Sequence, residues 1–302
     1  MEKKFRGIFA ALVTPFVGEN LSIEKFKDNI QKYNASALAG YVVLGSTGEC
    51  VSLSEEESAR LVRTAKEAAA KGKKVVAGTA RESTKLTIEF TNAMANLGID
   101  AALVRPPSYY KSKMSRDALK KHYLTLADKS RVPLIIYNIP QNTGISLDSQ
   151  LIIELSGHSK IVGLKESAGN LSFLGEVVPQ VPAGFSYLLG SGNVILPGLV
   201  MGACGAILSV ANAAPDICLK IYHLFQENKI EAAAKLQRDL IPLNKAIMET
   251  YGIPGLKYAL DVQGYNGGPC RLPLLPIEEN GKAELRGLLK RLGLKPWTRR
   301  PK

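Results

Sequence analysis

Cysteine and long apolar runs are both scarce in this sequence. Its four cysteines form no CxxC pair and show no metal-ligand spacing: Cys50, Cys204, Cys218 and Cys270. Free thiols in a reducing compartment are therefore predicted. No apolar run approaches the roughly 18 residues that a membrane span needs, and the first residues lead into an expected strand without the apolar core of a signal peptide. We expect a cytoplasmic protein with no membrane partner.

Histidine is equally scarce, with three residues in the chain: His122, His158 and His223. Two of them lie within helical patterns and His158 follows the end of another, so none stands at the end of an expected strand. Enzymes built on α/β barrels place metal ligands at strand ends. A metal-dependent mechanism is therefore disfavoured, and no metal site is predicted.

The positive charge of the chain is concentrated at its end. The net charge is +12, and residues 282–302 contain eight basic residues and one acidic residue, which accounts for +7 of it. A basic terminal helix and tail is usually a solvated face or a subunit contact, and no nucleic-acid-binding motif accompanies it. We expect no nucleic-acid partner. If the tail did bind nucleic acid, deleting residues 294–302 would abolish salt-dependent retention on heparin.

Strand-like and helix-like patterns alternate from residue 7 to residue 229. The first strand-like runs cover residues 7–16 and 40–46, and the helix expected at residues 54–70 begins with a capping box formed by Ser54 and Glu57. Eight such units follow one another, joined by short loops. Parallel strands need helical crossovers, and eight strands close a sheet without edges. The pattern therefore predicts an α/β fold, a (β/α)8 TIM barrel.

The runner-up fold is an open doubly wound sheet, but no GxGxxG motif follows the first strand to support its dinucleotide-binding form. After residue 229 the alternation stops, and three helical segments follow with a Gly/Pro-rich connector at residues 264–276. We predict a barrel domain at residues 1–229 and a C-terminal helical appendage at residues 230–302.

A single lysine interrupts the apolar run at residues 161–167, IVGLKES. A buried ammonium is costly unless it is paired or loses its proton, and a neutral amine attacks carbonyl groups. The alternative is structural: Lys165 could lie just past the strand and extend its amine into water. The other strand ends favour the first interpretation.

Two other strands end in polar groups that suit the same chemistry. One run ends in GSTGE, with hydroxyls at Ser46 and Thr47, and another ends at Tyr137 in IIYNIPQNTG. Each motif also has a purely structural interpretation. GSTGE could be a turn without a function, and Tyr137 could serve in packing with its hydroxyl in water. Together they suit a lysine that forms an imine with a 2-oxo acid, a phenol that moves protons and a turn that holds the carboxylate.

These three motifs resemble the class I pyruvate-dependent aldolases that include dihydrodipicolinate synthase and N-acetylneuraminate lyase, over essentially the whole chain. The resemblance implies a TIM barrel, usually a homotetramer built from dimers, that needs no cofactor beyond the covalent lysine imine. Its substrates would be pyruvate and an aldehyde. It also implies a role for each site residue: Lys165 forms the imine, Tyr137 relays protons, Ser46 and Thr47 complete the relay and bind the carboxylate, Tyr110 enters a neighbouring subunit's site, and Gly190 and Ile207 line the pocket.

Asn142 departs from the sequence pattern of the dihydrodipicolinate synthases in this family. Dihydrodipicolinate synthases typically carry an arginine there for the carboxylate of the aldehyde, and an amide cannot replace a bidentate cation. Glu55 and Ser58 occupy the positions of feedback-site histidines in lysine-inhibited synthases, so no lysine inhibition is expected. Segments such as PQNTG (140–144) and YYKSKMS (109–115) are more similar to 4-hydroxy-2-oxoglutarate aldolases.

The leading hypothesis is therefore cleavage of 4-hydroxy-2-oxoglutarate into pyruvate and glyoxylate, with Asn142 in the aldehyde site. Within the same class, the alternatives are dihydrodipicolinate synthase, which condenses pyruvate with aspartate semialdehyde, and a sugar-acid aldolase or N-acetylneuraminate lyase. From a different class, a non-catalytic paralogue that binds 2-oxo acids is the remote alternative.

Overall fold

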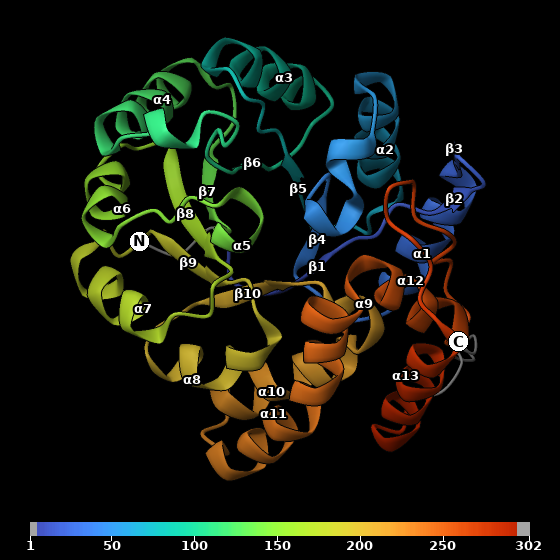
Figure 1. The fold of residues 1–302 in the computed structure, drawn as a ribbon. Helices are drawn as coiled ribbons and strands as arrows, with labels where there is room; N and C mark the ends of the chain where they lie inside the picture. Colours follow the sequence, from blue (N-terminus) through green and yellow to red (C-terminus); the bar gives the residue numbers. More distant parts are fainter. Residues whose placement is uncertain (1–4, 295–302) are drawn as a thin grey trace.

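A closed barrel of eight parallel strands forms the centre of the computed structural model, which describes residues 5–294 (Figure 1). The strands hydrogen-bond in the order β1-β10-β9-β8-β7-β6-β5-β4, with β4 returning to β1. They are β1 (Gly7–Ala11), β4 (Gly40–Val43), β5 (Lys74–Gly78), β6 (Ala101–Val104), β7 (Leu134–Asn138), β8 (Ile161–Glu166), β9 (Ser186–Leu189) and β10 (Gly205–Leu208). The predicted (β/α)8 barrel is confirmed.

The helices between the strands form a ring around the barrel, as Figure 1 shows. They are α1 (Ile23–Tyr33), α2 (Glu55–Ala68), α3 (Thr84–Asn96), α4 (Arg116–Lys129), α6 (Ser149–Ser156), α7 (Leu171–Val177), α8 (Ile195–Val200) and α10 (Pro215–Gln226), with the short α5 (Pro140–Thr143) and α9 (Val210–Ala213) beside strand ends. The predicted capping box is present at the start of α2, where Ser54 and Glu57 bond reciprocally. The first strand is shorter than expected: β1 ends at Ala11, and Phe16 instead begins a small hairpin of β2 (Phe16–Val17) and β3 (Asn20–Leu21).

Alternation along the strands divides the apolar residues into two cores. On β6, Ala102 and Val104 join the large core between the barrel and its helices, whereas Ala101 and Leu103 join a smaller cluster. Successive side chains of a strand point to opposite faces, so the smaller cluster fills the barrel interior. This arrangement explains why the strand sequences are continuously apolar and do not alternate with polar residues, because both faces of each strand are buried.

The C-terminal helices gather on one side of the barrel in Figure 1. They are α11 (Ile230–Lys245), which continues into a π-helical turn at Ala246–Thr250, α12 (Gly252–Val262) and α13 (Glu279–Arg291). Helix α11 packs on α10, α12 packs on α9, and α13 packs on α12. The division at residue 229 stays a prediction. The basic tail begins on α13, and its last part, residues 295–302, lies outside the described residues.

Candidate active site

Lys165 lies inside strand β8, directly beside Tyr137 of β7. The two residues are register partners in the sheet, and their side chains are 4% and 6% exposed. The Lys165 Nζ is 4.1 Å from the centroid of the Tyr137 ring. The alternative in which the lysine extends past the strand into water is therefore wrong, because the amine is held within the barrel.

Among residues 5–294, the interaction found for the Lys165 amine is its contact with the Tyr137 ring, and no ion pair accompanies it. The neighbouring Glu166 is buried but points to the opposite face of the strand. Its carboxylate accepts backbone N–H bonds from Ala168, Gly169 and Asn170 at 2.7 to 3.2 Å. Burial raises the pKa of Glu166, although these three bonds oppose the rise. Glu166 therefore does not neutralise the amine, which stays available to a carbonyl substrate.

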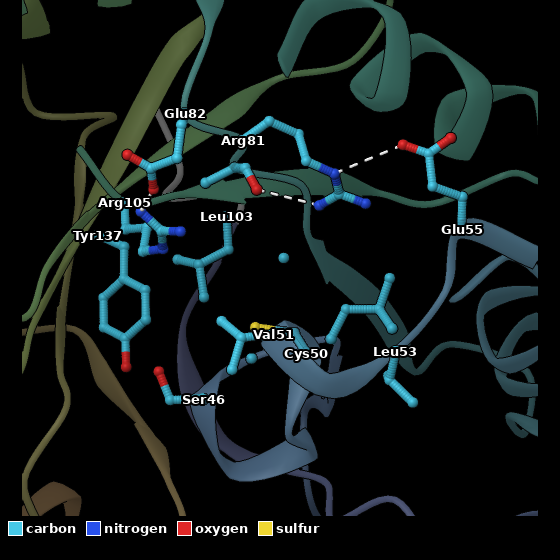
Figure 2. A pocket seen from close by; sticks show the side chains of 14 residues that line it. Ser46, Cys50, Val51, Leu53, Glu55, Arg81, Glu82, Leu103, Arg105 and Tyr137 are labelled. Atoms are coloured by element: carbon cyan, nitrogen blue, oxygen red, sulfur yellow. Dashed lines mark hydrogen bonds and ion pairs between the residues drawn. The ribbon is translucent and has the colours of Figure 1, made fainter. Parts of the chain in front are cut away.

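The GSTGE motif forms a 3₁₀ turn, η1 (Ser46–Gly48), at the carboxyl end of β4. Thr47 shares a hydrogen bond of 2.6 Å between its Oγ1 and the Oγ of Ser209, and the carbonyl of Gly48 accepts a 2.7 Å bond from the Thr14 hydroxyl. These contacts hold the turn against the ends of β1 and β10. Ser46 lines a cavity of about 260 Å³ together with Tyr137, and Figure 2 shows their side chains pointing toward one another.

Gly190 directly follows β9, and Ile207 lies within the neighbouring strand β10. A side chain at Gly190 would meet the Ser167 Oγ at 1.9 Å and the Glu166 carbonyl at 2.8 Å, so this close approach of two chain segments requires glycine. Ile207 is 1% exposed and belongs to the barrel-interior cluster with Tyr137. Ile207 thus packs in the barrel interior with Tyr137, and Gly190 adjoins the segment after Lys165.

Two of the predicted site residues, Asn142 and Tyr110, do not lie with Lys165 and Tyr137 inside the barrel. Asn142 lies exposed on α5, which follows the Tyr137 strand. Tyr110 is 69% exposed and packs edge-to-face on Tyr109, with ring centroids 5.1 Å apart. Its predicted place in a neighbouring subunit's site stays a prediction.

Sequence reasoning missed a buried ion pair directly behind η1. Glu49 ends the GSTGE motif in a left-handed conformation with φ 53°, and its Oε1 is 2.5 Å from the Nζ of Lys257 on α12. Each side chain is 1% exposed. Lys257 also donates to the carbonyl of Pro269 at 2.7 Å, while Glu49 accepts the Arg271 backbone N–H at 3.0 Å. The pair therefore joins the turn, α12 and the Gly/Pro-rich connector.

Two arginines were also missed, and both line the cavity that contains Ser46 and Tyr137. Arg81 follows β5 and Arg105 follows β6, and Figure 2 shows both side chains beside the cavity. Burial lowers the pKa of Arg81, and the carboxylate of Glu55 partly opposes this. Alternation on β6 could have indicated Arg105, because it continues the inward-facing series of Ala101 and Leu103.

Nowhere in residues 5–294 is a group of three or more His, Cys, Asp or Glu side chains placed to hold a metal ion. The same part of the chain contains no helix of the length and apolar character that crossing a membrane requires.

A buried lysine amine at the carboxyl end of a barrel strand, beside a tyrosine and a hydroxyl-bearing turn, defines the class: an imine-forming class I aldolase. The family model of the dihydrodipicolinate synthetase family matches residues 4–292. The chain therefore belongs to the dihydrodipicolinate synthetase family and is a carbon-carbon lyase of the imine-forming type.

Individual relatives agree with this family. A 4-hydroxy-tetrahydrodipicolinate synthase of Methanothrix thermoacetophila is 34% identical over 291 residues, covering 95% of this chain and 97% of the relative. A dihydrodipicolinate synthase from Cyanidioschyzon merolae with lysine bound is 28% identical, with a TM-score of 0.92 over 97% of this chain and 100% of that one. A monomeric dihydrodipicolinate synthase variant is also 28% identical, with a TM-score of 0.91 over 96% and 97% of the two chains.

Proposed function

We propose that this chain makes or cleaves the carbon-carbon bond between pyruvate and an aldehyde that carries a carboxylate, through an imine on Lys165. The observation that carries the proposal is the position of Lys165, a residue 4% exposed whose amine lies over the Tyr137 ring and forms no ion pair within residues 5–294. The amine attacks the ketone of pyruvate, and water leaves as the imine forms. Loss of a methyl proton then gives an enamine, whose carbon attacks the aldehyde.

In this proposal, Tyr137 and Ser46 move protons between the imine and the cavity. Both hydroxyls face the same space, and the phenol adjoins the amine across the β7–β8 register. The backbone N–H groups and hydroxyl of the turn at Ser46 and Thr47 hold the pyruvate carboxylate. Because Thr47 is fixed by Ser209, the turn is organised before substrate arrives.

Two aldehydes are candidates, each favoured by a separate observation. The relatives named above are synthases, and this favours aspartate semialdehyde and 4-hydroxy-tetrahydrodipicolinate synthase activity over our leading sequence hypothesis. Asn142 instead favours glyoxylate and cleavage of 4-hydroxy-2-oxoglutarate, because the amide lacks the cation that the resemblance associates with synthases.

Steady-state kinetics on purified protein decides between these candidates. We would compare kcat/KM for pyruvate with aspartate semialdehyde, for cleavage of 4-hydroxy-2-oxoglutarate, and for cleavage of N-acetylneuraminate. Turnover only of N-acetylneuraminate would contradict the proposal of a carboxylate-bearing aldehyde. No turnover of any of the three would favour the non-catalytic 2-oxo acid binder.

A homotetramer built from dimers, with Tyr110 completing a neighbouring site, is part of this proposal. Its support is the exposure of Tyr109 and Tyr110, which are 78% and 69% exposed although both are large aromatic side chains. At the positions of feedback-site histidines, Glu55 pairs with Arg81 at 3.6 Å and Ser58 is buried within α2. We propose on this basis that lysine does not inhibit the enzyme. The cytoplasmic location and the lack of a nucleic-acid partner stay predictions.

A further inference from the structure

Arg105 lines the cavity that also contains Ser46 and Tyr137. It is the residue after β6, and it continues the inward-facing series of Ala101 and Leu103. Strand β6 pairs with β7 so that Val104 is opposite Ile136, which places the next residue beside Tyr137. Arg105 and Tyr137 line one cavity, and Figure 2 shows the guanidinium on the same side of it as the phenol ring.

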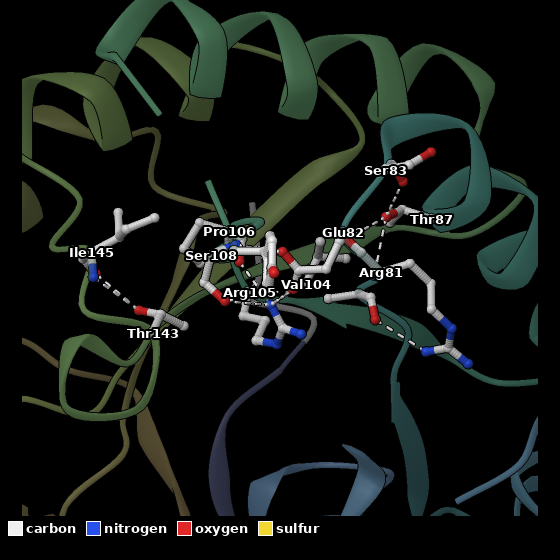
Figure 3. Close-up of polar contacts among 12 residues, drawn as sticks. Arg81, Glu82, Ser83, Thr87, Val104, Arg105, Pro106, Ser108, Thr143 and Ile145 are labelled. Atoms are coloured by element: carbon white, nitrogen blue, oxygen red, sulfur yellow. Dashed lines mark hydrogen bonds and ion pairs between the residues drawn. The ribbon is translucent and has the colours of Figure 1, made fainter. Parts of the chain in front are cut away.

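The guanidinium of Arg105 is anchored through one nitrogen only. Its Nη1 donates to the Glu82 Oε1 at 2.8 Å, to the Pro106 carbonyl at 3.0 Å and to the Ser108 Oγ at 3.3 Å (Figure 3). Within the described part of the chain, Nε and Nη2 have no hydrogen-bond acceptor. The side chain is 21% exposed. One nitrogen therefore fixes the group, while two others retain donors for a ligand.

Glu82 does not cancel this capacity, because it accepts a hydrogen bond from Nη1 of Arg105 and leaves Nε and Nη2 free. Its Oε2 accepts the backbone N–H groups of Ser108 and Tyr109 at 2.7 and 2.8 Å. These bonds and Arg105 hold the pKa of the carboxyl below its usual value, although burial alone would raise it. Glu82 thus fixes the loop after β6 and the position of Arg105.

Arg81 provides a second cation in the lining of the same cavity. Its guanidinium lies over the Phe90 ring at 3.6 Å, and its Nε pairs at 3.6 Å with Glu55, whose side chain is 75% exposed. Water screens that exposed carboxylate. Arg81 therefore strengthens the positive field of the cavity, whereas Arg105 is the cation on the same side of it as the Tyr137 ring.

We infer that Arg105 binds the carboxylate of the aldehyde substrate and supplies the cation that is absent at Asn142. This inference rests on the proposed function and specifies it further. A planar guanidinium with two free nitrogens can hold a carboxylate in a bidentate manner. Aldehydes with a carboxylate are then favoured over neutral sugar aldehydes, which offer no charged acceptor to Nε and Nη2.

The test compares two aldehydes of similar size, glyoxylate and the uncharged glycolaldehyde, in condensation with pyruvate. For Arg105→Gln we expect kcat/KM with glyoxylate to fall about 10- to 100-fold, as for loss of a charged hydrogen bond, and kcat/KM with glycolaldehyde to change less than about 3-fold. Arg105→Lys, which keeps a point charge, should recover part of the glyoxylate rate. Aspartate semialdehyde serves as a second carboxylated aldehyde.

Borohydride trapping of the pyruvate imine separates failure of this inference from failure of the proposed function. The Arg105→Gln protein should still trap pyruvate, which shows that its site is folded. If Arg105→Gln lowers kcat/KM equally with both aldehydes, or does not lower it with glyoxylate, the role inferred for Arg105 is overturned. Arg81→Gln is the matched control. If it lowers kcat/KM with glyoxylate as much as Arg105→Gln does, the effect belongs to the general positive field of the cavity. If the unmodified protein traps no pyruvate, the proposed function fails and this inference with it.

Discussion

Replacing Lys257 with methionine would leave the Glu49 carboxylate buried without its cationic partner. The two side chains are 2.5 Å apart and 1% exposed, so water cannot replace the lost interaction. Removing one partner of a buried pair costs about 3–5 kcal/mol. The Arg271 backbone N–H still reaches Glu49, while the Pro269 carbonyl also loses its donor. We therefore expect the free energy of unfolding to fall within that range.

Urea unfolding followed by fluorescence measures this loss, with Lys282→Met as the control. Lys282 pairs with Glu279 at 2.7 Å on the surface of α13, and that pair should contribute at most about 1 kcal/mol. The double variant Glu49→Gln with Lys257→Met should recover a large part of the stability, because no buried charge remains. A loss for Lys257→Met no larger than for Lys282→Met, or no recovery in the double variant, would refute this reasoning.

Two further predictions concern Tyr137 and His122. Tyr137→Phe should lower kcat by about 10²-fold or more, because a positioned general acid or base contributes about that much, and a loss below 10-fold would contradict the proton relay. Burial lowers the pKa of His122 to about 4, with its Nδ1 2.8 Å from the Thr84 hydroxyl. The unfolded chain takes up this proton near pH 6.5, so the free energy of unfolding should fall by about 3 kcal/mol as pH drops from 6.5 to 4. His122→Asn, which cannot titrate, should flatten this part of the urea-unfolding pH profile, and an unchanged profile would contradict the assignment.

The barrel and the centre of its site could be predicted because both depend on local patterns. Continuous apolar runs indicated strands buried on both faces, and the order of the units implied their neighbours in the sheet. Neighbouring parallel strands bring their carboxyl ends together, so Lys165 and Tyr137 had to meet once both ended adjacent strands. The structure adds that Lys165 belongs to the strand itself.

The remaining features depend on contacts that a local pattern does not contain. Glu49 and Lys257 are separated by 208 positions, and only the packing of α12 behind η1 makes them partners. Gly190 is required by the approach of Ser167, which belongs to another strand end. Arg105 could have been placed on the inward face by alternation, but its anchoring by Glu82 depends on the loop after β6. The role predicted for Tyr110 involves a second subunit and stays a prediction.

The most direct test of the central claim is intact-mass spectrometry after incubation with pyruvate and borohydride, followed by peptide mapping. An imine on Lys165 predicts one pyruvate-sized reduced adduct per chain, located in the peptide that contains residues 161–166, and no adduct in Lys165→Ala. An adduct on another lysine, or none in the folded protein, would contradict the role given to Lys165.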